Sequence, residues 1–336
     1  MRVDFSRADQ VVLTGLKDGA YTAACLLVGR GERVLFRRAY GRLSRNEEAP
    51  RANEQTRFDL DTLTEPLVTG MLALRAMEAG KLCLNDTLDT FLHAPEDKKD
   101  ITIAQLLCHT SGMRPCLPLQ EMAQQPQDAA RVILDQPLEA EPGTKMLYGG
   151  NGHMLLGQLL ECLYGMELSE LAVQEVFWPL KMQRAGYLPK DGNIAFADEN
   201  GNVFDDNARF LGGVSGHAGV FGSMDDLALW MQLLAADGVL PDGSRYLSKA
   251  SVSLVKKQWF PDRSLCFAFP GATGFTGDLF PAQTIGHATA TGCSVALDPE
   301  TGVYTVFLTN AVSAGESGYG IHRLRRLLHN AVYAAV

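Results

Sequence analysis

The sequence predicts an α+β fold in which the N- and C-terminal segments form one antiparallel sheet and the middle of the chain forms an inserted helical lobe. Three observations predict it: strand patterns occupy both ends of the chain, helical spacing fills the middle, and no repeat or low-complexity linker interrupts them. We therefore expect a single domain over residues 1–336, with a sheet region at about 1–60 and 264–336 and a helical lobe at about 61–263.

The elements follow from local patterns. Residues 22–29 (TAACLLVG) are almost wholly apolar and residues 33–40 (RVLFRRAY) half apolar, with a glycine-containing turn between them, which predicts two paired strands. From Pro66 to Gly80 apolar residues recur at helical spacing, and glycine is a common helix end. Further helices are expected at 101–108, 151–163, 225–238 and 321–332, and further strands at 284–287, 292–297 and 303–310.

Composition excludes several classes of protein. The chain has 336 residues, of which 46% are hydrophobic and 21% charged, as in globular proteins. Its formal net charge of −9 argues against nucleic-acid binding, which needs a basic stripe. No run of about 18 apolar residues is present, so we expect no membrane-spanning segment.

Cysteine usage and the first residues predict the compartment. The seven cysteines form no CxxC pair, and residues 1–10 lack the apolar core of a signal peptide. We therefore expect unpaired thiols and a cytoplasmic location. Patterns that hold a metal or a nucleotide (HExxH, paired Cys/His, an EF-hand loop, Walker A, GxGxxG after a strand) are absent from the sequence, so no cofactor or metal is expected.

Several stretches carry a resemblance to a known family. They are FDLDTLTEP (58–66), AGKLCLND (79–86), IAQLLCHTSGM (103–113), YGGNGHMLLG (148–157), GGVSGHAGVFGSMDDL (212–227) and residues 286–310. In this order the chain resembles the serine β-lactamase and penicillin-binding-protein superfamily, nearest to the class C β-lactamase and esterase branch, from about residue 20 to the C-terminus. The resemblance implies a β-lactamase/transpeptidase-like fold and a cleft in which three catalytic elements meet.

The first element of that family is a Ser-x-x-Lys at a helix start. The matching residues here are Thr62 and Glu65, so a hydroxyl persists while the neighbouring ammonium is replaced by a carboxylate. An ionised carboxylate disfavours further negative charge beside it. Glu65 could act as a general base for Thr62, but we favour a structural interpretation in which Thr-x-x-Glu forms a helix capping box.

The second element is a Tyr-x-Asn loop. Tyr148 matches its tyrosine, Gly150 stands where the family has the asparagine, and Asn151 comes one position later. We place all three in the cleft, with the role of Tyr148 left open between a packed aromatic residue and a proton-handling phenol.

The third element is a Lys- or His-x-Gly strand. The segment GHATATG (286–292) keeps His287 but has Thr289 in place of the glycine, and we expect this β-branched side chain to obstruct the strand edge. By the resemblance, the backbone N–H groups of Thr62 and Ala290 are the oxyanion donors. Glu65, His287, Thr289 and Ala290 are also expected to lie in the cleft.

Other polar residues receive structural interpretations. His217 in His-x-Gly precedes a helix rather than the closing strands, so it is not assigned to the third element and its role stays open between holding the loop and approaching the cleft. His109 is expected to be a scaffold residue at a helix end, and Ser111 has no partner readable from spacing. The pairs 47–48 and 205–206 are expected to be solvated loop charges.

Three hypotheses of function remain. The leading one is a β-lactamase-related pseudoenzyme that has lost acyl-enzyme chemistry and keeps a cleft for a small molecule or peptide. The runner-up is an active esterase, amidase or β-lactamase-like hydrolase with a rewired site that uses Thr62 or Tyr148. The third is a structural or assembly role with the cleft plugged by Thr289 and its neighbours. The sequence does not indicate the oligomeric state.

Overall fold

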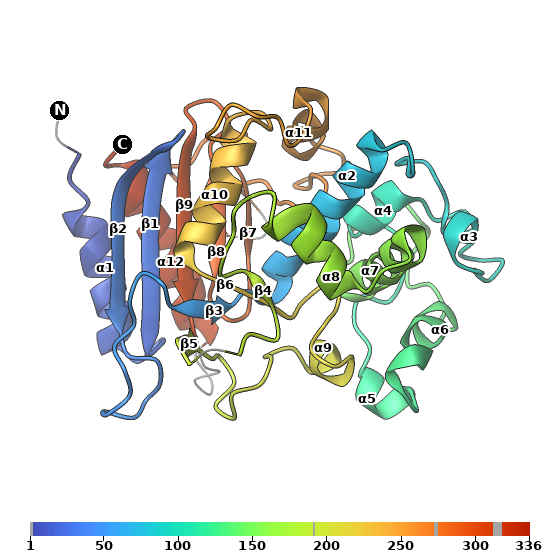
Figure 1. Cartoon of the computed structure of the whole chain (residues 1–336), viewed down its shortest axis with the longest axis horizontal. Coiled ribbons are helices and arrows are strands. Elements are labelled where there is room, and N and C mark those ends of the chain that lie inside the picture. The colour runs from blue at the N-terminus through green and yellow to red at the C-terminus, as the bar shows by residue number, and fades with distance from the viewer. Residues whose placement is uncertain (1–2, 191, 272–274, 312–317) are drawn as a thin grey trace.

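The computed structural model describes residues 3–190, 192–271, 275–311 and 318–336, and in the last range the side chains from residue 320 onward. Its main sheet has five strands in the order β2-β1-β9-β8-β7, all antiparallel (Figure 1). These strands are β1 (Ala23–Arg30), β2 (Arg33–Gly41), β7 (Ile285–Ala288), β8 (Ser294–Leu297) and β9 (Val303–Thr309). The pairing of β1 with β9 joins the two ends of the chain, which confirms the expected closure of the sheet.

Both faces of the sheet are covered, which explains why residues 22–29 are so apolar. Helices α1 (Ser6–Lys17) and α12 (Gly318–Tyr333) pack on one face, where Ala24, Leu26 and Val28 are buried. Helix α10 (Met224–Ala235) packs on the other face, and the alternate residues Ala23, Cys25 and Leu27 join the main hydrophobic core there. The alternation follows from the two-residue period of a strand.

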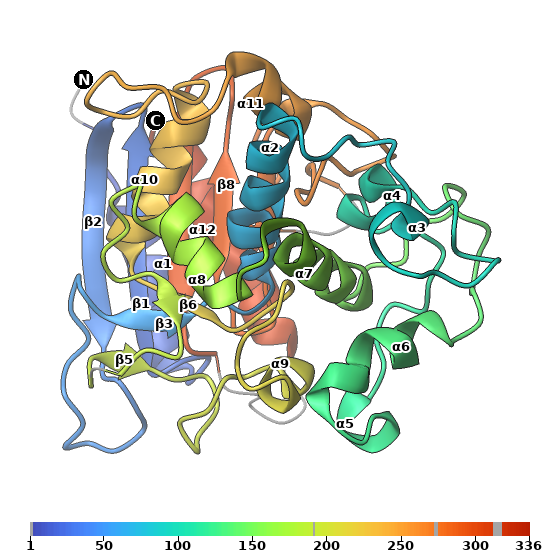
Figure 2. The ribbon, with the colours of Figure 1, turned by 45° about the vertical axis from the view of Figure 1, so that its right-hand side comes forward.

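The helical lobe lies on the opposite side of the sheet from α1 (Figures 1 and 2). Its helices are α2 (Met71–Glu78), α3 (Leu88–Phe91), α4 (Ile103–Leu107), α5 (Leu119–Met122), α6 (Ala129–Leu134), α7 (Asn151–Tyr164), α8 (Leu168–Ala172), α9 (Asp206–Phe210) and α11 (Lys249–Lys256). Short 3₁₀ turns η1 (Asp61–Leu63) and η3 (Pro126–Asp128) and π-helical turns η2 (Glu65–Gly70) and η4 (Val173–Phe177) complete it. In the described residues, no helix combines the length and apolar character needed to cross a membrane.

A second, small sheet connects the lobe to the main sheet. It has the order β4-β6-β3-β5 and consists of β3 (Arg57–Asp59), β4 (Gly186–Tyr187), β5 (Ile194–Ala195) and β6 (Val220–Gly222). The sequence patterns did not predict this sheet, because its strands are only two or three residues long. The α+β prediction is confirmed, while helix α1 was missed.

The fold places the first and third elements of the family beside each other. Strand β3 ends at Asp59 and leads through η1 into η2 and α2, and β7 at the edge of the main sheet contacts η1. The loop that precedes α7 and the end of α4 reach the same region from the lobe. The candidate site therefore lies where the sheet edge meets the helical lobe.

Candidate functional site

The structure brings together the three residues at the catalytic positions of the resemblance. His287 Nε2 lies 3.2 Å from Thr62 Oγ1 and 3.3 Å from the Tyr148 hydroxyl. His287 is buried, whereas Thr62 is half-buried and Tyr148 is 40% exposed. The hydroxyl groups of Thr62 and Tyr148 thus share one imidazole nitrogen at the edge of β7.

The hydrogen bonds of His287 fix the role of its ring. Nδ1 lies 3.2 Å from the carbonyl oxygen of Cys266, so Nδ1 carries the proton and Nε2 presents a lone pair to the two hydroxyl groups. Burial lowers the pKa of His287 to about 4, against an opposing effect of Glu65, so the ring is neutral at pH 7. A hydroxyl, a neutral base and a group that orients the base are the parts of an activated nucleophile.

Tyr148 lies between a cation and a second imidazole. The Arg263 guanidinium carbon is 5.0 Å from its ring centroid, and the ring of His109 lies 4.6 Å away on centroids. Desolvation, followed by the charge of Glu65, raises the pKa of the Tyr148 phenol well above its ordinary value of 10.0. The hydroxyl is therefore protonated at pH 7 and can donate a hydrogen bond but has little tendency to act as a base.

The expected oxyanion hole is altered. The backbone N–H of Ala290 donates a 3.0 Å hydrogen bond to Oδ2 of Asp61, so this donor already has an acidic partner. Asp61 is buried and has a left-handed φ of 46°, a conformation that Asp tolerates better than most residues. Burial, followed by the charge of Asp205, raises the pKa of Asp61 to about 6. Sequence reasoning missed this contact because Asp61 matches no catalytic position.

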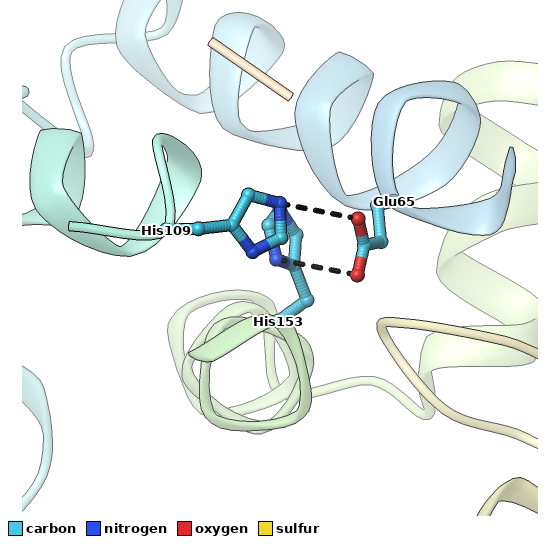
Figure 3. A group of neighbouring side chains, drawn as sticks. All are labelled: Glu65, His109 and His153. Atoms are coloured by element: carbon cyan, nitrogen blue, oxygen red, sulfur yellow. Dashed lines mark ion pairs between the residues drawn. The ribbon is translucent and has the colours of Figure 1, made fainter. Parts of the chain in front are cut away.

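Glu65 does not form the predicted capping box, and that interpretation is wrong. Its carboxylate is fully buried, and neither oxygen has a hydrogen-bond partner among the described residues. Oε2 lies 3.4 Å from His109 Nε2 and Oε1 lies 3.7 Å from His153 Nδ1 (Figure 3). Burial lowers the pKa of both histidines to about 3, so two neutral rings face one carboxylate. A buried charge without hydrogen bonds costs several kcal/mol.

Three of the expected cleft residues make contacts within the protein. Thr289 is buried, and its hydroxyl lies 2.8 Å from Thr291 Oγ1, so its side chain does not obstruct the strand edge as expected. The Asn151 side-chain nitrogen donates a 2.8 Å hydrogen bond to the carbonyl of Arg114. Gly150 packs closely against His217: a Cβ at this position would lie 2.5 Å from the His217 ring, so no larger residue fits without a shift.

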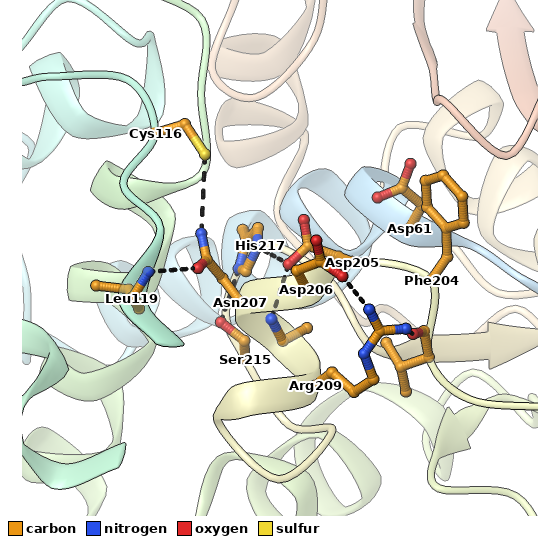
Figure 4. Close-up of polar contacts among 12 residues, drawn as sticks. Asp61, Cys116, Leu119, Phe204, Asp205, Asp206, Asn207, Arg209, Ser215 and His217 are labelled. Atoms are coloured by element: carbon orange, nitrogen blue, oxygen red, sulfur yellow. Dashed lines mark hydrogen bonds and ion pairs between the residues drawn. The ribbon is translucent and has the colours of Figure 1, made fainter. Parts of the chain in front are cut away.

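His217 belongs to a network beside the site (Figure 4). Its Nε2 lies 2.9 Å from Asp205 Oδ1 and its Nδ1 lies 2.8 Å from Ser215 Oγ. Burial acts to lower the pKa of His217, but the hydrogen bond and charge of Asp205 outweigh it and the pKa is raised. Asp205 also caps α9 by accepting from the N–H of Ala208 at 2.7 Å. The prediction of a solvated loop charge is therefore wrong for Asp205, while Asp206 is exposed as expected.

A groove opens beside this network. It has a volume of about 800 Å³ and is lined by residues of the 116–120 and 197–209 segments, among them Cys116, Phe204, Asp205 and Asn207. Asn207 bridges the two walls, since its side chain accepts from the N–H of Leu119 at 3.1 Å and donates to the carbonyl of Leu117 at 2.8 Å.

His109 is the scaffold residue that the sequence predicted and also part of the Glu65 cluster. It follows α4 with a left-handed φ of 57°, and its Nδ1 lies 3.3 Å from the carbonyl oxygen of Gly149. Ser111 is buried, and its Oγ accepts from the N–H of Met113 at 3.4 Å. His153 received no role in the sequence analysis, because one buried histidine in a helix carries no motif.

Comparison with known proteins agrees with this geometry. A model of the β-lactamase family matches residues 8–330. The chain belongs to the β-lactamase family. Among relatives in this family is a putative D-alanyl-D-alanine carboxypeptidase of Escherichia coli O157:H7, 27% identical over 87% of this chain and 79% of the relative. The resemblance deduced from the sequence is confirmed.

Solved structures share the fold. EstCE1, described as a hydrolase with promiscuous acyltransferase activity, is 23% identical and superposes with a TM-score of 0.80 over 97% of both chains. The octameric penicillin-binding protein homologue from Pyrococcus abyssi is 17% identical, with a TM-score of 0.78 over 98% of this chain and 77% of that chain. At these identities the family neighbours support the β-lactamase/transpeptidase-like architecture.

Proposed function

We propose that this protein is a ligand-binding member of the β-lactamase family that does not turn over acyl-enzyme intermediates. The observation that carries the proposal is the hydrogen bond from the Ala290 N–H to the Asp61 carboxylate. A tetrahedral intermediate needs preorganised donors for its developing negative charge. Here the Ala290 N–H, one of the two donors implied by the resemblance, already binds the Asp61 carboxylate. That carboxylate would also repel the negative charge of the intermediate.

The position of Glu65 supports the same conclusion. It stands where the family has an ammonium group near the nucleophile, and its carboxylate is buried among uncharged rings. An ammonium would favour the alkoxide form of the Thr62 hydroxyl, whereas a carboxylate disfavours it. In hydrolases that depend on a nucleophile and its activator, the loss of either lowers the rate by several orders of magnitude.

The charges of the site favour a particular class of ligand. Burial raises the pKa of both Asp59 and Asp61. The charge of Asp205 adds to both shifts, and Glu65 adds to that of Asp61. The buried Arg263 is a cation whose guanidinium carbon lies 5.0 Å from the Tyr148 ring centroid. We propose a small molecule or peptide with an amino group, because an additional carboxylate would face this acidic cluster.

The cysteines support a reducing, cytoplasmic setting as part of the proposal. All seven lie in the described part of the chain and are unpaired, and Cys25, Cys108, Cys266 and Cys293 are buried. Buried free thiols are typical of proteins in reducing compartments.

A second candidate function is an acyl hydrolase that uses Thr62 as the nucleophile. The 3.2 Å contact from Thr62 Oγ1 to His287 Nε2 favours it, since His287 is neutral and oriented by the Cys266 carbonyl. The E. coli relative, a putative D-alanyl-D-alanine carboxypeptidase, and EstCE1, a hydrolase, support the same reaction class. Activity would require the hydrogen bond between the Ala290 N–H and the Asp61 carboxylate to break, so that this N–H could bind the oxyanion instead.

Intact-mass measurement separates the two candidates. The protein is incubated with a fluorophosphonate, a penicillin and a p-nitrophenyl ester, beside Thr62→Ala and the matched control Thr144→Ala, which alters an exposed threonine. We expect no adduct on the wild-type protein. An adduct that disappears in Thr62→Ala and persists in Thr144→Ala would overturn the proposal and establish the hydrolase.

A binding measurement tests the ligand class. Thermal unfolding is followed with dipeptides that carry a free amino group and with their N-acetylated counterparts. We expect the free amine to raise Tm more than the acetylated peptide, and Asp61→Asn with Asp205→Asn to reduce the difference. An equal effect of both peptides would contradict the assignment of an amine-binding site.

A further inference from the structure

We propose that Glu65, His109 and His153 bind a divalent transition-metal ion, with Zn²⁺ as the best match to their donor set. The proposal does not rest on the ligand-binding function proposed above, although the Glu65 carboxylate belongs to both. Its three side chains come from η2, from the second residue after α4 and from the first turn of α7, and all point to one spot (Figure 3). A carboxylate and two imidazoles are a common protein ligand set for zinc.

The separations of the donor atoms match a metal site. One donor atom from each residue can be chosen so that all three lie within 4.8 Å of one another, and the two shortest carboxylate–imidazole contacts are 3.4 and 3.7 Å. Tetrahedral zinc with bonds of about 2.0–2.1 Å places its ligands about 3.4 Å apart. The widest separation in the cluster must therefore shorten by up to about 1.4 Å to reach that geometry.

The second observation is that the donors lack other partners. Both oxygens of Glu65, Nε2 of His109 and Nδ1 of His153 are buried and have no hydrogen bond among the described residues. All three residues are at least nine-tenths buried and their free atoms face one another. Buried polar atoms are normally satisfied, so an unsatisfied cluster of this kind indicates a missing partner.

The tautomer of His109 shows which kind of partner is missing. Its Nδ1 faces the carbonyl oxygen of Gly149 at 3.3 Å, so Nδ1 must be the protonated nitrogen. Nε2 therefore presents a lone pair to a carboxylate oxygen that also presents lone pairs. Two acceptors at this distance repel each other unless a cation lies between them.

The outer contacts are those that metal-binding histidines usually make. A ligating imidazole commonly donates its other N–H to a nearby acceptor, which holds the ring in position. The Gly149 carbonyl has this role for His109, and Cys266 Sγ lies 3.4 Å from Nε2 of His153. Three protein ligands leave one coordination position for water or an exogenous ligand.

The sequence alone could not reveal this site. Its ligands are separated by more than forty residues at each step, so no spacing motif links them, and the expectation of no metal rested on the absence of such motifs. A shared proton is the other cation that could bridge Glu65 and His109, and the experiment distinguishes it from a metal.

The test uses the untagged full chain, freed of metal with a chelator and then titrated with Zn²⁺ in competition with a chromophoric chelator. We expect one tightly bound ion per chain, and Co²⁺ in its place should give the visible absorption of a tetrahedral site. Glu65→Gln, His109→Ala and His153→Ala should each weaken binding by more than about tenfold, since even outer-contact substitutions cost 10–100-fold. The matched controls Glu47→Gln and His93→Ala alter exposed residues and should bind as the wild-type protein does.

Glu65→Gln keeps the test decisive if the alanine variants do not fold. It is nearly isosteric and removes the buried charge, so in the absence of metal its Tm should equal or exceed that of the wild-type protein while Zn²⁺ no longer raises it. If the wild-type protein binds no more Zn²⁺ than Glu65→Gln and His153→Ala, the metal assignment is overturned and a shared proton explains the cluster. Binding that is lost equally in His93→Ala would also overturn it.

Discussion

Replacement of Asp61 by asparagine should stabilise this protein at alkaline pH. Asp61 is buried, and burial followed by the charge of Asp205 raises its pKa from 3.8 to about 6. The folded state therefore holds the proton more tightly than the unfolded state does. The contribution of this group to stability is fully present below about pH 4 and is lost as the pH rises through about 6.

The magnitude follows from the two pKa values. At 1.36 kcal/mol per pKa unit, the rise from 3.8 to about 6 corresponds to about 3 kcal/mol lost by pH 8. Asparagine avoids this loss because it does not ionise, tolerates the φ of 46°, and retains an oxygen that can accept from the Ala290 N–H. The substitution also removes a charge that helps to raise the pKa of Asp59 to about 7.

Urea unfolding at pH 4 and pH 8 measures the effect, with chelator present so that bound metal does not contribute. Asp61→Asn should match the wild-type protein within about 1 kcal/mol at pH 4 and exceed it by about 2–3 kcal/mol at pH 8. Asp100→Asn, which alters an exposed aspartate, should show no such pH dependence. The reasoning is refuted if Asp61→Asn is less stable than the wild-type protein at pH 8, or if the difference does not grow with pH.

Three further predictions concern the surroundings of the site and the core. Asp205→Asn should lower the free energy of unfolding by about 1–3 kcal/mol between about pH 4 and 6.5, because the lowered pKa of Asp205 and the raised pKa of His217 make their ion pair stabilising in that range. The loss should fade above the raised His217 pKa and below the lowered Asp205 pKa, which urea unfolding at a series of pH values would show. Gly150→Ala should lower the free energy of unfolding by about 1–3 kcal/mol, since the new Cβ would lie 2.5 Å from the His217 ring. The control Gly186→Ala adds a Cβ into open space and should change Tm little. Leu27→Ala removes a fully buried side chain between the sheet and α10 and should lower the free energy of unfolding by about 2–5 kcal/mol; a loss below 1 kcal/mol would contradict the assigned core.

Local patterns predicted most of the main sheet and the longer helices. The apolar run before Gly29 is β1, and the turn at 298–302 joins β8 to β9 as expected. Helix α1 was missed, although its buried residues Ala8, Val12 and Gly15 do recur at helical spacing. The small sheet was missed because strands of two or three residues are too short to show a period.

The site was predicted in part. Motif order placed Thr62, Tyr148 and His287 in one cleft, and the structure joins their polar atoms within 3.3 Å. The capping box expected for Glu65 is not formed, and the Thr289 hydroxyl contacts Thr291 rather than obstructing the strand edge. For Glu65 the deciding contacts are to His109 and His153, which are far away in the chain, so no local pattern could predict them.

The sequence by itself determined the α+β class, the family and the positions at which that family's chemistry would occur, because these depend on local periodicity and on the order of motifs. Only the tertiary structure decided that Asp61 occupies the Ala290 N–H and that Glu65 meets His109 and His153. The physical reason is that both contacts join residues far apart in the chain, and that Asp61 and Glu65 are buried, where an unpaired charge is costly and a polar group needs a partner or a bound ion.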